Sequence, residues 1–160
     1  MEIRKATGKD LAAITAVEAV CFPPAEAAPE ESFHKRLEAF ADHFWLLWDG
    51  DRLVSFVNGM ATDEPDLRDE MFADATLHRA DGAWQMIFGV ATIPEYQRQG
   101  CAGAVLQQAI EDAKVQGRKG LVLTCKDFRV HYYAKFGFED EGVSQSEHGG
   151  AVWHQMRLTF

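Results

Sequence analysis

The sequence predicts an α/β domain built on a mixed central β-sheet of about six or seven strands, with about four helices on its two faces. Two apolar segments with the composition of buried strands, Trp84–Thr92 and Gly120–Cys125, flank a segment with helical periodicity. Strand-like and helix-like segments alternate along the rest of the chain. At 160 residues, with no internal repeat or linker, we expect residues 1–160 to form a single domain.

The first half of the chain is expected to hold three strands and two helices before a polar excursion. Thr7 or Asp10 offers an N-cap for the first helix, and three prolines make residues 22–29 a loop. Phe33, Leu37 and Phe40 have the spacing of a second helix. In order, the predicted elements are a strand at Glu2–Ala6, a helix to about Val20, a helix at Ser32–Ala41, strands at Phe44–Trp48 and Leu53–Met60, and an acidic excursion over 62–81 with a short helix.

The second half opens with the strand Trp84–Thr92, which we expect to be continuous and central. The apolar residues between Ala102 and Ala113 mark one face of a helix that ends near Gly117. The remaining predicted elements are the strand Gly120–Cys125, a short helix at Phe128–Lys135, and a strand pair at Phe138–Val143 and Ala151–Phe160.

The composition argues against several function classes. Twenty-five acidic residues against 16 Lys and Arg give a net charge of −9, which disfavours general binding to nucleic acid or to an anionic membrane. No apolar run approaches the roughly 20 residues that span a bilayer. The three cysteines have neither CxxC nor zinc-site spacing. We therefore expect a cytoplasmic protein with reduced thiols and no metal site.

The charge is unevenly distributed. Residues 97–135 hold seven basic and three acidic side chains, inside a chain that is acidic overall. This segment predicts a polyanionic ligand on one side of the molecule; the alternative is that the charges only solvate surface helices.

The sharpest local signal is a strand, a glycine turn and a helix within Gly89–Gly103. The small residues Gly100, Ala102 and Gly103 open the helix and let a ligand approach the backbone. The free N–H groups of a helix N-terminus attract phosphate. The pattern is neither GxGxxG nor GxxxxGK[ST], so dinucleotide and ATP loops are disfavoured. The alternative is a glycine-rich turn with no ligand.

Two motifs resemble the GCN5-related N-acetyltransferase (GNAT) superfamily. The segment Gln97-Arg-Gln-Gly-Cys-Ala102 matches its Q/R-x-x-G-x-G/A signature, and Tyr132-Tyr-Ala-Lys-Phe-Gly-Phe138 matches its FY-x-x-x-GF element. The order of elements along nearly the whole chain agrees with the GNAT fold. Within the superfamily the sequence most resembles the arylalkylamine, or serotonin-type, branch. That resemblance rests on Val17-Glu18 before Cys21-Phe-Pro23, on Gly50–Phe56, on Leu123–Asp127 and on Trp153–Met156.

The resemblance implies acetyl-CoA as co-substrate. The backbone of Val90 and Thr92 would pair with the pantetheine arm, and the Val90 N–H would polarise the acetyl carbonyl. The pyrophosphate would lie on the N–H groups of residues 98–103, with the basic segment beside it; Arg98, Lys126, Arg129 and Lys135 are candidate phosphate contacts. The implied cofactor-binding residues are Val90, Thr92, Gln97, Arg98, Gln99, Gly100, Cys101, Ala102, Gly103 and Tyr133.

Tyr133 aligns with the general acid of the family. A phenol is protonated at neutral pH and can donate its proton to the leaving thiolate. Tyr133 and Val90 are therefore the implied catalytic residues. The alternative is that Tyr133 only caps the helix as a half-buried aromatic; Tyr132 is expected to pack.

One departure from the serotonin-type branch concerns the base. The histidine pair of that branch corresponds to Met86 and Phe88 here, and neither can accept a proton. The base could be another group or a chain of waters, or the amine could arrive partly neutral. The candidate replacements are Glu26, Glu30, His34, His148 and His154.

The acceptor pocket is expected to combine the 22–29 loop, the acidic excursion and the last strand. Phe22, Phe88 and Trp153, with Phe56, are the candidate substrate-binding residues, although core packing is the alternative for aromatics.

The predicted function is transfer of acetyl from acetyl-CoA to a primary amine of a small molecule, arylalkylamine-like or polyamine-like, by direct attack. The alternatives are a protein or peptide amine as acceptor, or a non-catalytic acyl-CoA sensor. The expected partners are acetyl-CoA and the amine, in a monomer or homodimer.

Overall fold

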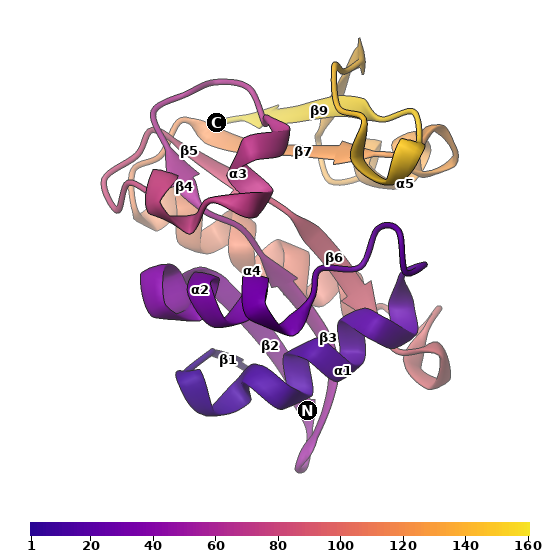
Figure 1. Cartoon of the computed structure of the whole chain (residues 1–160). Helices are drawn as coiled ribbons and strands as arrows, with labels where there is room; N and C mark the ends of the chain where they lie inside the picture. The colour runs from indigo at the N-terminus through magenta and orange to yellow at the C-terminus, as the bar shows by residue number, and fades with distance from the viewer.

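A computed structural model describes residues 1–160, and Figure 1 shows the arrangement of its elements. Five α-helices and nine β-strands alternate along the chain, with short 3₁₀ turns between them. The helices are α1 (Leu11–Cys21), α2 (Glu30–Phe40), α3 (Asp69–Ala73), α4 (Cys101–Val115) and α5 (Val130–Ala134). The strands are β1 (Glu2–Lys5), β2 (Phe44–Asp49), β3 (Arg52–Asn58), β4 (Ala61–Thr62), β5 (Trp84–Ile87), β6 (Gly89–Thr92), β7 (Gly120–Cys125), β8 (Glu139–Val143) and β9 (His154–Thr159).

The strands form two sheets instead of the single sheet that the sequence predicts. One sheet has the order β1-β2-β3-β6 and is antiparallel throughout. The other has the order β4-β5-β7-β9-β8, in which only β5 and β7 are parallel. The α/β class and the mixed pairing are confirmed, and the strand count exceeds the predicted six or seven.

The segment Trp84–Thr92 is the main correction. It divides at Phe88 into β5 and β6, which belong to different sheets. The N–H of Phe88 still donates to the Asn58 carbonyl at 2.7 Å, but β6 then continues along β3 while β5 pairs with β4 and β7. Both halves have the apolar composition of a buried strand, so hydrophobicity does not show where the segment divides. The division follows from the change of pairing partner between β5 and β6.

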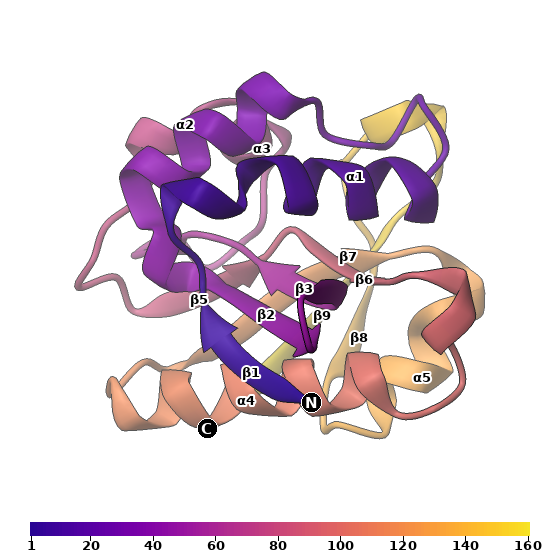
Figure 2. The ribbon, with the colours of Figure 1, turned by 90° about the horizontal axis from the view of Figure 1, so that it is seen from below.

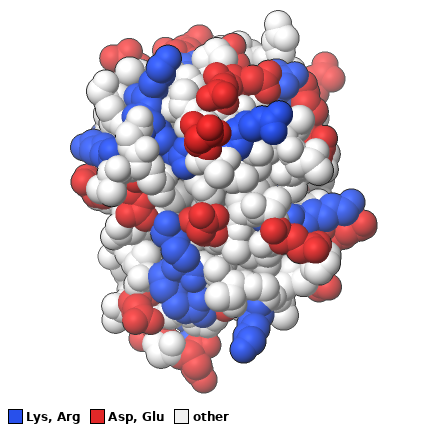
Figure 3. Space-filling model, turned by 90° about the vertical axis from the view of Figure 1, so that its left-hand side faces the viewer, with Lys and Arg blue, Asp and Glu red and all other residues white.

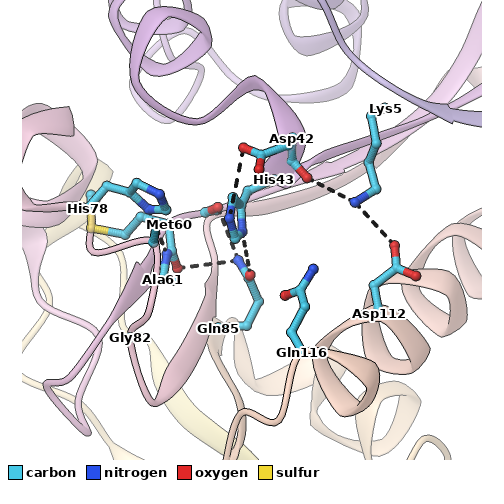
Figure 4. Close-up of polar contacts among 12 residues, drawn as sticks. Lys5, Asp42, His43, Met60, Ala61, His78, Gly82, Gln85, Asp112 and Gln116 are labelled. Carbon is cyan, nitrogen blue, oxygen red and sulfur yellow. Dashed lines mark hydrogen bonds and ion pairs between the residues drawn. The ribbon is translucent and has the colours of Figure 1, made fainter.

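A close backbone approach fixes the place where the sheets separate. A Cβ on Gly59 would lie 1.7 Å from the Met86 carbonyl oxygen, so only glycine fits there. The amide of Gln85 donates to the carbonyl oxygens of Gly59, Met60 and Met86, at 3.0, 3.3 and 2.8 Å. Gln85 in turn accepts from His43 Nδ1 at 2.7 Å (Figure 4). This buried network holds the end of β3 against β5.

Helices cover both faces of the antiparallel sheet. Figure 2 shows α1 and α2 on one side and α4 on the other, and both α1 and α4 contact β3. Thr7 begins the first helical segment with a capping box in which its side chain and that of Asp10 bond each other's backbone N–H. The α-helix begins at Leu11, after a 3₁₀ turn, and ends at Cys21, so the predicted cap and end agree with the structure within one residue.

The predicted loop and excursion also take the expected form. Residues 22–29 connect α1 to α2 without a helix or strand, and the excursion after β4 holds the short helix α3. None of the helices has both the length and the apolar character that a bilayer crossing requires.

Candidate active site

The turn between β6 and α4 presents unpaired backbone N–H groups at a helix end. Gly100 is the N-cap residue of α4 and adopts the left-handed conformation, with φ of +83°. Arg98 also has a positive φ, +62°. The first helical bond runs from the Ala104 N–H to the Gly100 carbonyl, at 3.0 Å. The N–H groups of residues 101–103 therefore point out of the end of a 15-residue helix, where its dipole favours an anion.

The free edge of β6 continues this polar surface. The N–H of Ile93 donates to the Val54 carbonyl at 3.0 Å, which sets the phase of the antiparallel ladder. Alternation then directs the backbone N–H groups of Val90 and Thr92 away from β3. Thr92 shows this directly, because its carbonyl accepts from Cys21 Sγ at 3.2 Å and from Gln97 Nε2 at 3.1 Å.

Two cavities meet beside this edge. The first, here called the turn cavity, has a volume of about 420 Å³ and is lined by the β6–α4 turn together with Tyr132 and Tyr133. The second, here called the aromatic cavity, has a volume of about 470 Å³ and lies among the 22–29 loop, α3 and the 144–153 segment. Five residues line both: Cys21, Phe22, Val90, Arg129 and Tyr133.

Tyr133 lies at this junction with its phenol nearly enclosed. It is 7% exposed. Burial raises the pKa of the Tyr133 hydroxyl above its usual value near 10, although the positive charge of Arg129 opposes the rise. The hydroxyl is therefore a proton donor at neutral pH. Tyr132 packs edge-on against Tyr133 and Phe136, with ring centroids 5.1 and 5.3 Å apart, and also lines the turn cavity.

The aromatic cavity takes its name from the rings in its wall. Phe88 packs against Phe72 with the two rings tilted and their centroids 4.6 Å apart. The Trp153 indole N–H donates to the His148 carbonyl at 2.8 Å, and the His148 ring stacks on Phe72 at 5.5 Å. The aromatic lining consists of Phe22, Phe72, Phe88, Phe128, Tyr133, His148 and Trp153.

Two buried charged residues in this wall were not among the candidates from the sequence. Glu18 is 7% and Arg36 is 4% exposed, and both line the aromatic cavity. Burial raises the pKa of the Glu18 carboxyl; the N–H of Ala28, which donates to Glu18 Oε2 at 2.9 Å, opposes the rise. The sequence held a signal for each: Glu18 follows Ile14 and Val17 on the buried face of α1, and Arg36 lies between Phe33 and Leu37 on that of α2.

Nine of the ten implied cofactor-binding residues line a cavity. The exception is Gln99, whose side chain donates to the Glu95 carbonyl at 3.2 Å, outside the cavity walls. The three candidate substrate residues, Phe22, Phe88 and Trp153, all line the aromatic cavity. Phe56 does not, because it is fully buried in the core.

The candidate bases separate into two groups. Glu26 and His148 line the aromatic cavity, where Glu26 pairs with Lys126 at 2.7 Å. Glu30, His34 and His154 do not line either cavity. Met86 is fully buried outside both cavities, so of the Met86–Phe88 pair only Phe88 faces the site.

The candidate phosphate contacts are similarly divided. Arg98 and Arg129 line the turn cavity, Lys126 lines only the aromatic cavity, and Lys135 lines neither.

The acidic excursion carries less unpaired negative charge in the structure than its sequence suggests. Arg68 pairs with Glu64 and Glu70, and Arg157 pairs with Asp66. On the face shown in Figure 3, acidic and basic side chains are interspersed. Of the excursion's acids, only Asp69 lines the aromatic cavity.

Comparison with known families decides the class of protein. Residues 11–138 match the model of the acetyltransferase (GNAT) family. The chain belongs to the GNAT acetyltransferase family. GNAT members use an acyl-CoA as acyl donor. The turn cavity lies beside the N-terminus of α4, whose free N–H groups suit an anion.

Solved structures share the fold at low identity. The GNAT-like decarboxylase GphF, in complex with isobutyryl-CoA, is 18% identical with a TM-score of 0.86, over 99% of both chains. The loading GNATL domain of CurA from Lyngbya majuscula is 16% identical with a TM-score of 0.84, over 99% of this chain and 96% of that one. The ribosomal-protein-S18-alanine N-acetyltransferase from Escherichia coli is 18% identical with a TM-score of 0.74, over 99% and 92%.

These structures show the GNAT fold of this chain and do not select a branch. The named activities among them differ, and none of the three exceeds 18% identity. The GNAT family predicted from the sequence is confirmed, and with it an acyl-CoA as the donor. Acetyl-CoA as that donor stays a prediction. The serotonin-type branch stays a prediction.

Proposed function

We propose that this GNAT acetyltransferase transfers acetyl from acetyl-CoA to the primary amine of a small molecule by direct attack. The observation that carries the proposal is that Val90 and Tyr133 line both cavities, so a donor in the turn cavity and an acceptor in the aromatic cavity would meet beside them. The aromatic lining favours an arylalkylamine over a polyamine as the acceptor.

The donor would be held largely by backbone. The pyrophosphate would accept from the N–H groups at the start of α4, and the pantetheine arm would follow the free edge of β6. The outward N–H of Val90 would donate to the thioester carbonyl, where negative charge develops in the tetrahedral intermediate.

Each bond change then has an assigned group. The neutral amine attacks the thioester carbon, the N–C bond forms and the C–S bond breaks. The Tyr133 hydroxyl donates its proton to the leaving thiolate, and the proton lost by the amine restores the phenol through solvent. Before this attack the acceptor arrives as an ammonium ion. Glu18 accepts the proton that converts the ammonium to the neutral amine, directly or through water. Its raised pKa brings Glu18 closer to the operating pH than an ordinary carboxylate.

Cysteine chemistry is not needed for this route. Burial raises the pKa of Cys21 and of Cys125 to about 11, so both stay as thiols at neutral pH. A thiol is a poor nucleophile, which favours direct transfer over an acyl-enzyme.

Two polar ties across the aromatic cavity favour a small acceptor over a protein one. His148 Nε2 lies 2.9 Å from the Glu26 carbonyl, which joins the 144–153 segment to the 22–29 loop. Asp69 accepts from Ser146 Oγ at 2.6 Å and from the Glu147 N–H at 3.0 Å. An extended peptide would have to break these contacts to enter.

Release of CoA from acetyl-CoA with a panel of acceptors tests the proposal. The panel holds arylalkylamines, polyamines, amino acids and short peptides with free N-termini. The proposal expects turnover with a small amine above the rate without acceptor. Turnover only with peptides would replace it with protein acetylation, and tight acetyl-CoA binding without any turnover would replace it with a sensor.

A further inference from the structure

Arg36 is a buried cation whose hydrogen-bonding capacity is largely unused. It projects from α2 into the space between β3 and α3, where its Nη1 donates to Asn58 Oδ1 at 3.1 Å and its Nη2 to the Phe72 carbonyl at 2.9 Å. These two bonds use two of the five N–H donors of a guanidinium. Nε is buried and has no partner.

The charge of Arg36 has no carboxylate in direct contact, although the charge of Glu18, buried in the same wall, acts on it through space. No carboxylate oxygen lies within 4.0 Å of its nitrogens, whereas Lys126, also in the wall of the aromatic cavity, meets Glu26 at 2.7 Å. The guanidinium lies over the rings of Phe33 and Phe88, 5.2 and 4.8 Å from their centroids. Burial lowers the pKa of Arg36 to about 10, which still leaves it charged at neutral pH.

A buried charge that is only partly neutralised is unfavourable unless something else compensates it. The two aromatic faces and the charge of Glu18 compensate part of this. An anion in the aromatic cavity would supply the rest, because Arg36 lines that cavity. A guanidinium with free N–H groups is suited to a carboxylate.

We infer that Arg36 binds a carboxylate of the acceptor, so that the acceptor is an aromatic or apolar amino acid and not a simple amine. The inference rests on the proposed function and names its substrate class. Glu18 lies in the same wall as the opposite charge and suits the ammonium group. The rings of Phe22, Phe88 and Trp153 suit an apolar side chain.

The net charge of the whole protein makes a preference for an acidic ligand informative. At a net −9, the chain repels anions in general. A preference for an acidic ligand over its neutral isostere must therefore come from a local cation.

The test compares N-acetylphenylalanine with N-acetylphenylalaninamide, binding to the CoA-loaded protein, by calorimetry. The two ligands differ only in the carboxylate, and neither reacts. We expect the acid to bind at least about tenfold more tightly, the scale of a charged hydrogen bond. Equal or weaker binding of the acid overturns the inference.

Variants assign the preference to Arg36. Arg36→Gln should reduce the acid-to-amide ratio to about one, whereas Arg79→Gln, which removes the same charge from an exposed side chain, should leave it unchanged. If Arg36→Gln does not fold, the other two cations of the aromatic cavity decide. A ratio retained in both Lys126→Gln and Arg129→Gln supports Arg36, and a ratio lost in either variant transfers the role to that residue. Selective binding of the acid without any turnover would reject the proposed function and keep this inference. Turnover of phenethylamine in preference to phenylalanine would keep the proposed function and reject this inference.

Discussion

Val90 of β6 and Tyr133 of α5 line the same junction between the turn cavity and the aromatic cavity, although one belongs to a strand and the other to a short helix far along the chain. One offers a backbone N–H and the other a buried hydroxyl. A thioester between them would meet a donor for its carbonyl oxygen and a donor for its leaving sulfur. The chemistry proposed here depends on this pair.

Tyr133→Phe should reduce kcat by about 10²–10⁴-fold, because the leaving thiolate loses its proton donor. The affinity for acetyl-CoA should stay within a few-fold, since the ring remains in the wall. Steady-state kinetics and titration with acetyl-CoA measure the two effects. Tyr132→Phe, which removes the neighbouring hydroxyl, is the matched control and should retain activity. An unchanged kcat in Tyr133→Phe would remove the acid role.

Gly100→Ala should weaken acetyl-CoA binding, and the loss of binding free energy should exceed the loss in the free energy of unfolding. A Cβ at Gly100 meets no atom within 4 Å, so it would project into the turn cavity and obstruct the phosphates. Gly50→Ala is the control: Gly50 also has a positive φ and open surroundings, but lies in the β2–β3 turn. Each substitution should cost roughly 1–2 kcal/mol of backbone strain. Equal acetyl-CoA affinity in both variants would argue against phosphate binding at this turn.

Gly59→Ala should destabilise the protein by about 3 kcal/mol or more, beyond the usual range of overpacking, because its Cβ would overlap the Met86 carbonyl. Gly8→Ala, where a Cβ meets nothing within 4 Å, should change the free energy of unfolding by less than about 1 kcal/mol. Urea unfolding of both variants measures the difference. Similar stabilities would mean that β3 and β5 do not approach each other as described.

Stability should fall as the pH drops from about 6.5 towards 4, in part through His78. Burial and the neighbouring His43 lower the pKa of His78 to about 4 in the folded protein. The unfolded chain, with an ordinary pKa near 6.5, therefore binds more protons over this range. His78 Nδ1 also accepts the Ala61 N–H at 3.1 Å, a bond that protonation removes (Figure 4).

The variant His78→Asn keeps an acceptor near Nδ1 and cannot titrate. Its unfolding temperature should decline less between pH 7 and pH 4.5 than that of the wild type. Parallel declines in the two proteins would exclude His78 as a source of the acid sensitivity.

Glu18→Gln should lower kcat/KM and remove the acidic limb that the Glu18 carboxyl gives to its pH profile. The amide oxygen can still accept the Ala28 N–H, so the loop should keep its place. His148→Gln is the comparison, because His148 is a candidate base in the same wall and, unlike Glu26, is not paired with Lys126. If His148→Gln alone changes the acidic limb, His148 and not Glu18 is the base.

The sequence predicted the parts of the site that depend on local pattern. Each of these parts depends on residues that are adjacent in the sequence: the glycine turn, the helix that it opens and the aromatic loop at Phe22. The structure places them together. The division at Phe88 is not local, because it depends on which strands pair with each half of an apolar segment. Glu18 and Arg36 were missed because a charged residue on a helix is ordinarily exposed, and only the packing of α1 and α2 encloses them.

The most direct test of the account is the thermal unfolding of the wild-type protein with and without acetyl-CoA. A ligand at about 100 times its Kd stabilises the native state by roughly 2.7 kcal/mol, which raises the midpoint by several degrees in a domain of this size. Such a rise is expected, reduced in Gly100→Ala and retained in Tyr133→Phe. No rise at millimolar acetyl-CoA would contradict it, because both the transfer reaction and its site depend on that binding.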